Sequence, residues 1–154
     1  MKLKCLLACL LLAIPAFLPA QTAQAIEELL DTKAISNQQA AWLVLEAANI
    51  SGPAGVSGQA AAFRYAADRG WLPANVQGEG RVRLDQVCLL LMRAFDIKGG
   101  IFYSLFGSPH YAYRELTYLN VIQGRAEPGM AVSGELLLFM IGRVLSQFEL
   151  ERDQ

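Results

Sequence analysis

The sequence repeats itself, and this repetition limits the folds that the chain can adopt. A gapless shift of 50 residues places residues 62–95 on residues 112–145, with arginines and apolar residues in register. A further shift of 47 residues places residues 35–47 on residues 82–94. Repeats of this period are single supersecondary units that bury their apolar faces against neighbouring copies. The pattern therefore predicts three copies of one unit around a common core.

The best-preserved part of each copy is a strongly apolar helix. These three helices are expected to run roughly from Ser36 to Asn49, from Arg83 to Asp96 and from Ser133 to Phe148. Because each is apolar almost all round in its middle, we expect all three inside a helical bundle. Ser36 and Ser133 are suitable N-caps, since a serine hydroxyl accepts an otherwise unpaired amide of the first turn.

A more amphipathic helix precedes the second and third buried helices. These outer helices are expected over Gln59–Arg69 and His110–Leu119, and Pro109 favours the start of the latter. Gly70 and Asn120 follow at equivalent positions, and both residue types tolerate the left-handed conformation that ends a helix. No stretch alternates between apolar and polar residues over a useful strand length. The predicted fold class is therefore all-α.

The N-terminus has the pattern of a signal peptide. Lys2 and Lys4 precede an apolar run from Cys5 to Leu18, and Ala23-Gln24-Ala25 places small residues before a cut. At about 14 residues the run is shorter than the ~20 needed to cross a bilayer, so no stable transmembrane anchor is expected after cleavage. The alternatives are a retained anchor and a lipoprotein modified at Cys9.

The predicted organisation is a signal peptide over residues 1–25 and a single helical-repeat domain over residues 26–154. The units of this domain cover about residues 26–50, 59–98 and 109–149. The first unit keeps only a short helix, Ile26 to Leu30, ahead of its buried helix, and terminal repeats are often atypical. With 54% apolar and 18% charged residues, the chain has the composition of a folded protein rather than a disordered one.

Charge and residue types exclude several functions. The chain has 13 basic and 14 acidic residues, so it lacks the basic field that gathers nucleic acid. After cleavage Cys88 is the one cysteine left, in an apolar run where packing is its expected role. One histidine, His110, and one buried cysteine cannot build a metal site. We therefore expect no nucleic acid partner, no metal and no cofactor.

Catalytic groups are equally sparse. Glycoside hydrolysis needs a pair of carboxyl groups or one perturbed glutamate in a cleft. Glu115 is expected on an exposed helical face, and Glu135 in a first helical turn, where its charge suits the helix dipole. No nucleophile can be matched to His110 with specificity. We therefore expect a non-enzyme, with glycan cleavage by Glu115 as a weaker hypothesis.

Short motifs recur at the repeat positions. The third unit contains Tyr111-Ala112-Tyr113, Asn120-Val121-Ile122-Gln123-Gly124, Pro128 and Val132-Ser133-Gly134-Glu135. The second contains Tyr65-Ala66-Ala67, Gly70-Trp71-Leu72-Pro73 and Val82-Arg83-Leu84-Asp85, and the first keeps Ile35-Ser36-Asn37-Gln38. These motifs resemble S-layer homology repeats, the envelope-anchoring module of many bacterial surface proteins.

The resemblance implies a fold in which three buried helices surround a pseudo-threefold axis, with outer helices and ligand grooves between the lobes. It also implies an exported module, in the periplasm or on the cell surface of a bacterium, that binds a cell-wall glycan or an envelope protein. In the family an arginine helps to bind an anionic glycan. Its position falls on Asn37, Leu84 and Gly134 here, and Arg83 stands one residue away.

Aromatic and arginine side chains are the candidate ligand-binding residues, because both stack on sugars or on a partner's side chains. They are Trp71, Arg83, Tyr111, Tyr113 and Arg114. Tyr111 and Tyr113 project to either side of one helix, so at least one of them is expected to be exposed. Trp71 follows a helix end and either caps the core or lines a groove.

A glycine-bounded apolar segment, Gly99 to Gly107, separates the second and third units. We expect it to form a short helix that fills space between the lobes. The alternative is an exposed apolar surface for a protein or lipid partner, with Ile101, Phe102 and Phe106 as contact residues. That alternative supports a different function, a periplasmic protein–protein adaptor without glycan affinity.

Overall fold

The computed structural model describes residues 26–124 and 126–152, and every regular element among them is a helix. The helices are residues 26–31, α3 (Asn37–Ala47), α4 (Gln59–Asp68), α5 (Leu84–Ala94), α6 (Ile101–Phe106), α7 (Pro109–Tyr118) and α8 (Gly134–Arg152). The predicted all-α class is therefore confirmed. The predicted signal peptide lies outside the described residues.

The helix starts follow the expected capping chemistry. The Ser36 hydroxyl accepts the Gln39 amide at 3.2 Å, and the Ser133 hydroxyl accepts the Leu136 amide at 3.1 Å. Pro109 is the first residue of α7, where its missing amide leaves no intrahelical bond unmade. The predicted caps are confirmed, although α8 continues four residues beyond the predicted end at Phe148.

Four helices end in the same way. Gly70 and Asn120 have positive φ angles of 65° and 56°, as the sequence predicts, and so do Asn49 and Asp96, at 54° and 51°. The amide that follows each of them donates to a carbonyl five residues earlier: Ile50 to Leu45, Trp71 to Ala66, Ile97 to Met92 and Val121 to Leu116. This bond pattern satisfies carbonyls at the helix end and turns the chain back over the helix.

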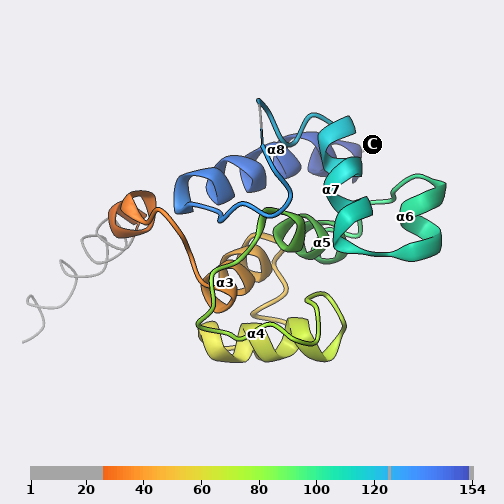
Figure 1. The fold of residues 1–154 in the computed structure, drawn as a ribbon. Helices are drawn as coiled ribbons and strands as arrows, with labels where there is room; N and C mark the ends of the chain where they lie inside the picture. Colours follow the sequence, from red (N-terminus) through yellow and green to blue (C-terminus); the bar gives the residue numbers. More distant parts are fainter. Residues whose placement is uncertain (1–25, 125, 153–154) are drawn as a thin grey trace, which may run out of the picture.

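The three copies of the buried helix meet through a ring of backbone hydrogen bonds. The Ile35 amide donates to the Val132 carbonyl at 2.9 Å, Val132 to Val82 at 3.3 Å, and Val82 to Ile35 at 3.0 Å. These three residues occupy the same position in the repeat and are completely buried. The helices that follow them, α3, α5 and α8, each contact the other two (Figure 1). The three copies are therefore arranged cyclically.

A second cyclic set of bonds covers the starts of these helices. The first amide of α3, at Asn37, donates to the Gly80 carbonyl at 2.9 Å. Those of α5 and α8, at Leu84 and Gly134, donate to the carbonyls of Met130 and Thr32 at 3.0 and 2.9 Å. Each buried helix is thus capped by chain that leads into another copy. Backbone groups that a buried helix start would leave unpaired are satisfied between units.

The outer helices pack on the buried helix that precedes them in the sequence. α4 lies against α3, and α7 lies against α5 (Figure 1). Residues 26–32 lie at the start of α8. The contact is close, because a Cβ added at Gly134 would stand 1.9 Å from the Leu29 carbonyl oxygen. The short first unit therefore supplies packing for the last one.

The core is built from matching positions of the three copies. Those nearest the helix centres are Ala40, Val87 and Leu137 in one layer and Val44, Leu91 and Ile141 in the next, all buried. Cys88 is also completely buried, so its predicted packing role is confirmed. Burial is the main cause that raises the pKa of its thiol, which keeps the sulfur protonated and unreactive.

Candidate functional site

The five predicted ligand-binding residues do not meet in one groove. Arg83 stands at the start of α5, where its Nη2 lies 2.5 Å from Asp85 Oδ2 and its Nε lies 3.1 Å from Asp85 Oδ1. The Asp85 side chain is only 10% exposed, against 54% for Arg83. The bidentate pair compensates the charge of a largely buried carboxylate. In this structure the Arg83 guanidinium therefore neutralises the Asp85 carboxylate at the start of α5.

The three positions that align with the arginine of S-layer homology repeats, Asn37, Leu84 and Gly134, have structural roles in this chain. The Asn37 side-chain nitrogen donates to the carbonyls of Gln77 and Gly80 at 2.8 and 2.9 Å. Leu84 is completely buried, and Gly134 lies against the N-terminal segment. None of the three provides a cation for an anionic ligand.

Tyr111 and Tyr113 are both half-buried, so the prediction that at least one is exposed is wrong. The Tyr113 hydroxyl donates to the Ala126 carbonyl at 2.8 Å, which draws its ring onto the core. Tyr111 is covered by α6, because the rings of Phe102 and Phe106 stack on it at centroid distances of 5.9 and 5.2 Å. The two tyrosines project to either side of α7, as the helical period predicts, but contacts from other segments cover both side chains.

Trp71 combines the two roles considered for it. Its indole packs half-buried against the core and meets Tyr65 edge-on, with ring centroids 5.8 Å apart. It also lines a cavity of about 340 Å³ together with Arg93, Asp96 and Tyr103. The Arg93 guanidinium carbon stands 5.6 Å from the centre of the Tyr103 ring. Burial is the main cause that raises the pKa of the Tyr103 phenol, and Arg93 partly opposes it.

The predicted short helix between the second and third units exists as α6, but it does not fill space between lobes. It projects from the molecule beside α7 (Figure 1). Its outward side chains are Ile101, Phe102, Leu105 and Phe106, which are 84%, 62%, 72% and 58% exposed. Tyr103 is the residue of α6 that turns into the core. The interpretation as packing filler is wrong because a single buried residue anchors a helix of this length.

Two of the candidate ligand-binding residues lie beside α6. Tyr111 and Arg114 line a cavity of about 300 Å³ together with Ile101, Phe102 and Glu115. Arg114 is exposed. The predicted partner surface and part of the predicted ligand site are therefore one region, formed where α6 lies against α7. Leu105 belongs to the same surface, although sequence reasoning left it out.

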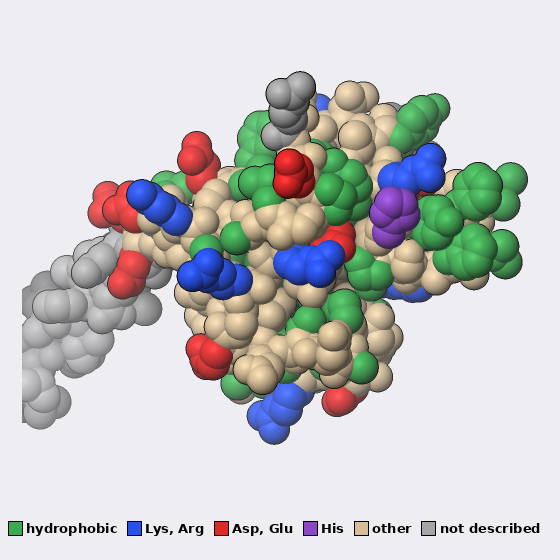
Figure 2. Space-filling model, viewed as in Figure 1, with side chains coloured by type: hydrophobic (Ala, Val, Ile, Leu, Met, Phe, Trp, Pro, Cys, Tyr) green, Lys and Arg blue, Asp and Glu red, His purple; other side chains and the backbone are tan. Residues whose placement is uncertain are grey.

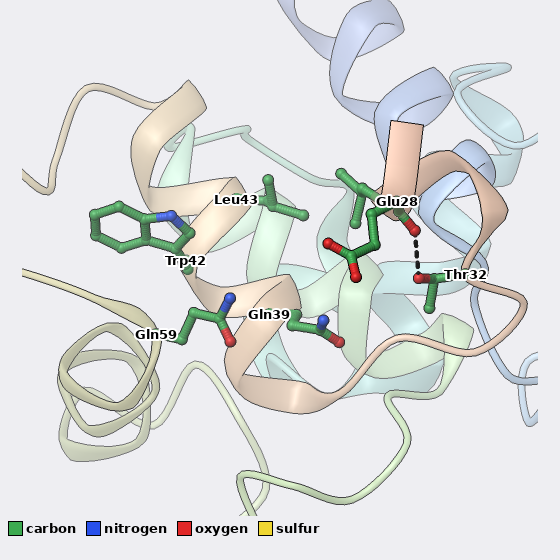
Figure 3. Close-up of a pocket in the computed structure, with 7 residues that line it drawn as sticks. Glu28, Thr32, Gln39, Trp42, Leu43 and Gln59 are labelled. Atoms are coloured by element: carbon green, nitrogen blue, oxygen red, sulfur yellow. Dashed lines mark hydrogen bonds between the residues drawn. The ribbon is translucent and has the colours of Figure 1, made fainter. Parts of the chain in front are cut away.

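A different cavity, of about 350 Å³, lies between the N-terminal segment, α3 and the start of α4 (Figure 3). Three segments line it, with Glu28, Leu29 and Thr32 from the N-terminal segment, Gln39, Trp42 and Leu43 from α3, and Gln59 from the start of α4. The wall thus combines one aromatic ring with two amides, a hydroxyl and a carboxylate. We call it the α3–α4 cavity.

Several polar groups of the α3–α4 cavity keep bonding capacity. The Gln39 side-chain oxygen accepts the Ser36 amide at 2.9 Å, which leaves its NH₂ group for other partners. The Thr32 hydroxyl donates to the Glu28 carbonyl at 2.8 Å, the bond drawn in Figure 3. No side-chain hydrogen bond joins the Trp42 indole or the Gln59 amide to another of the described residues. The wall therefore offers both donors and acceptors.

The α3–α4 cavity is not predicted from the sequence above, although the three copies of the repeat differ at one of its residues. Trp42 occupies the repeat position of Leu89 and Phe139. Leu89 is buried, whereas Trp42 is half-buried beside the start of α4. A large indole that stands where another copy has a buried leucine marks a place where the copies differ in their surroundings.

The described residues offer few groups for catalysis. They contain no cluster of three histidine, cysteine or acidic side chains that could hold a metal ion. Glu135 lies in the first turn of α8, as predicted, and Glu115 lies in the cavity between α6 and α7. Each of the two cavities around Glu28 and Glu115 has a single carboxylate among its described residues, whereas glycoside hydrolysis commonly uses two.

Comparison with protein-family models, curated proteins and solved structures gives no match for this chain. The likeness to S-layer homology repeats therefore depends on the sequence motifs and stays a prediction. Within the part of the chain that the structure describes, no helix has the length and apolar character that crossing a membrane requires.

Proposed function

We propose that this chain is an exported, non-enzymatic binding module of the bacterial envelope, similar to S-layer homology modules, that binds a cell-wall glycan. The observation that carries the proposal is the α3–α4 cavity, with Trp42 beside the amides of Gln39 and Gln59. An indole face packs against the C–H groups of a sugar ring, and side-chain amides bond to its hydroxyl or acetamido groups. A few polar groups in a partly apolar hollow are the usual make-up of a small-molecule site.

The electrostatics of the cavity favour a neutral or N-acetylated glycan over an anionic polymer. Its only charged side chain among the described residues is Glu28, which would repel an anionic group. The family's cation is missing at Asn37, Leu84 and Gly134, and the neighbouring Arg83 is paired with Asp85. The proposed ligand is therefore a glycan such as the peptidoglycan backbone, and not a pyruvylated polymer.

The test is co-sedimentation of residues 26–154 with purified peptidoglycan sacculi, with and without attached polymers, at low and moderate salt. We expect binding that survives salt, does not need the attached polymers and falls strongly in Trp42→Ala. Trp71→Ala is the matched control, since it removes another half-buried indole, which lines a different cavity. Loss of binding in the Trp71 variant alone would move the site to the region that the sequence predicts.

Protein that stays in the supernatant under all these conditions would contradict glycan binding. The function left would then be the alternative from the sequence, a periplasmic adaptor without glycan affinity. Its support is the exposed apolar surface of α6. For that function, Phe102→Asp combined with Phe106→Asp should leave the fold intact and abolish capture of the partner protein.

A further inference from the structure

The projecting segment around α6 combines apolar exposure with a complete absence of charge. Residues 99–109 contain no acidic, basic or histidine side chain. Ile101, Phe102, Leu105 and Phe106 form the exposed part of the tip. Figure 2 shows these hydrophobic side chains gathered at one end of the molecule, on a convex protrusion. Placing this tip in an apolar medium would therefore bury no charged group.

Several polar groups within the tip are paired internally. The Ser104 amide donates to the Gly100 carbonyl at 3.0 Å, and the Gly107 amide donates to the Tyr103 carbonyl at 2.7 Å. The Ser104 hydroxyl donates to the Gly99 carbonyl at 3.2 Å. In a membrane, backbone groups that lack a partner are costly, so internal pairing is a requirement for insertion. These three bonds meet that requirement for part of the tip.

The tip is also held in place before any partner arrives. Phe102 and Phe106 stack on Tyr111 of α7, and Tyr103 is buried beneath Arg93. The exposed side chains are thus presented by a helix with its own anchor in the core. Ordering costs that would oppose binding have already been met in folding.

The base of the tip carries more basic than acidic side chains. Arg93, His110 and Arg114 are all exposed, and Figure 2 shows the histidine and a basic residue beside the hydrophobic end. Lys98 is close in sequence and is paired with Asp96. Glu115 is the other carboxylate of this region. With His110 counted as neutral, the base has a net charge of +1, in a chain whose formal net charge is −1.

We propose that α6 is an interfacial membrane anchor, which inserts Ile101, Phe102, Leu105 and Phe106 into the surface of an anionic phospholipid bilayer. Apolar residues that enter the boundary of the acyl chains, together with basic residues at the level of the headgroups, are the two attractions that hold peripheral proteins on membranes. The convex shape favours a bilayer over a protein, since lipids adapt to any apolar tip. This inference uses a surface separate from the α3–α4 cavity and does not depend on glycan binding.

The test is hydrogen–deuterium exchange on the full chain, with vesicles of phosphatidylcholine and phosphatidylglycerol, with vesicles of phosphatidylcholine alone, and without lipid. The apolar run at residues 5–18 can itself attract vesicles, so the readout must be local to α6. We expect the amides of residues 101–107 to exchange about tenfold more slowly with the anionic vesicles. Weaker protection is expected with neutral vesicles, because their surface does not attract the positively charged residues beside the tip.

The decisive variant is Ile101→Ser combined with Leu105→Ser. Both side chains point to solvent and neither belongs to the aromatic stack, so the fold should persist while the protection of α6 disappears. Phe139→Ser is the matched control, since it removes an exposed phenyl ring from α8 and should leave the protection unchanged.

Three results would overturn the proposal. The first is α6 exchange that anionic vesicles do not slow, and the second is protection that remains in the double variant. The third is protection by a purified envelope protein with none from vesicles, which would assign the surface to a protein partner. Retention of glycan binding in the double variant would separate this outcome from the proposed function.

Discussion

The two connectors that lead from a buried helix to its outer helix differ sharply. Both begin after a left-handed residue, Asn49 or Asp96, and both end at an outer helix, α4 or α7. The first passes through small residues in turns, over residues 51–58, and exposes no large apolar side chain. The second inserts α6 and exposes four. The same repeated helices thus carry two very different connectors, and the exposed apolar surface of α6 is a property of the second connector rather than of the repeat.

The largest expected effect concerns the framework formed by the three buried helices, α3, α5 and α8. Leu91→Ala removes a completely buried side chain from the centre of α5, and the cavity should lower the free energy of unfolding by about 2–5 kcal/mol. Leu105→Ala removes the same side chain from the connector, where the change should stay within about 0.5 kcal/mol. Urea unfolding of both variants measures the difference. Similar losses in the free energy of unfolding at the two positions would contradict the distinction between framework and connector.

The next effect concerns the closing contact between the first and last units. In Gly134→Ala the new Cβ would stand 1.9 Å from the Leu29 carbonyl oxygen, so the N-terminal segment must move. We expect a loss of about 1–3 kcal/mol and faster proteolysis within residues 26–32. Gly142→Ala is the control on the same helix, where the Cβ meets nothing within 4 Å, and it should be neutral or stabilising. Equal behaviour of the two variants would show that this contact contributes little.

A smaller effect is expected at the turn that follows α4. Gly70 has a φ of +65°, and a Cβ there meets nothing within 4 Å, so Gly70→Ala tests backbone strain alone. The cost should be about 1–2 kcal/mol, the penalty of the left-handed conformation for alanine. Gly52→Ala, in the first connector, has open space and no positive φ, and it should leave thermal unfolding nearly unchanged.

The smallest effect on stability at neutral pH belongs to Cys88. Burial raises the pKa of its thiol, so the folded chain keeps a proton that the unfolded chain releases above the ordinary thiol pKa of 9.0. The stabilising contribution is therefore complete below that pH and declines as the pH rises above it. At pH 8, iodoacetamide should leave Cys88 unmodified until denaturant is added. Peptide mapping by mass spectrometry reports this site separately, and rapid labelling of native protein would contradict the buried position.

The repeat made much of the framework predictable. Serine caps, left-handed helix ends and buried helix centres are local patterns, and the copies reinforce one another at equivalent positions. The placement of α6 was not predictable, because an apolar segment has the same sequence whether it fills a gap or projects. The α3–α4 cavity was missed since its wall needs residues 26–32, whose position depends on α8, about a hundred residues away. The placement of α6 and the wall of the α3–α4 cavity both depend on packing between segments that are far apart in the sequence.

The hydrogen-bond ring among Ile35, Val82 and Val132 has a consequence for synthesis. Two of its three bonds involve Val132, and the cap of α8 comes from Thr32. While the chain emerges from the ribosome, α3 and α5 can pair, but the ring cannot close until residues up to Val132 have been translated. Residues 26–32 pack against the start of α8, about a hundred residues later in the chain, so we expect the N-terminal segment to find its place late in synthesis.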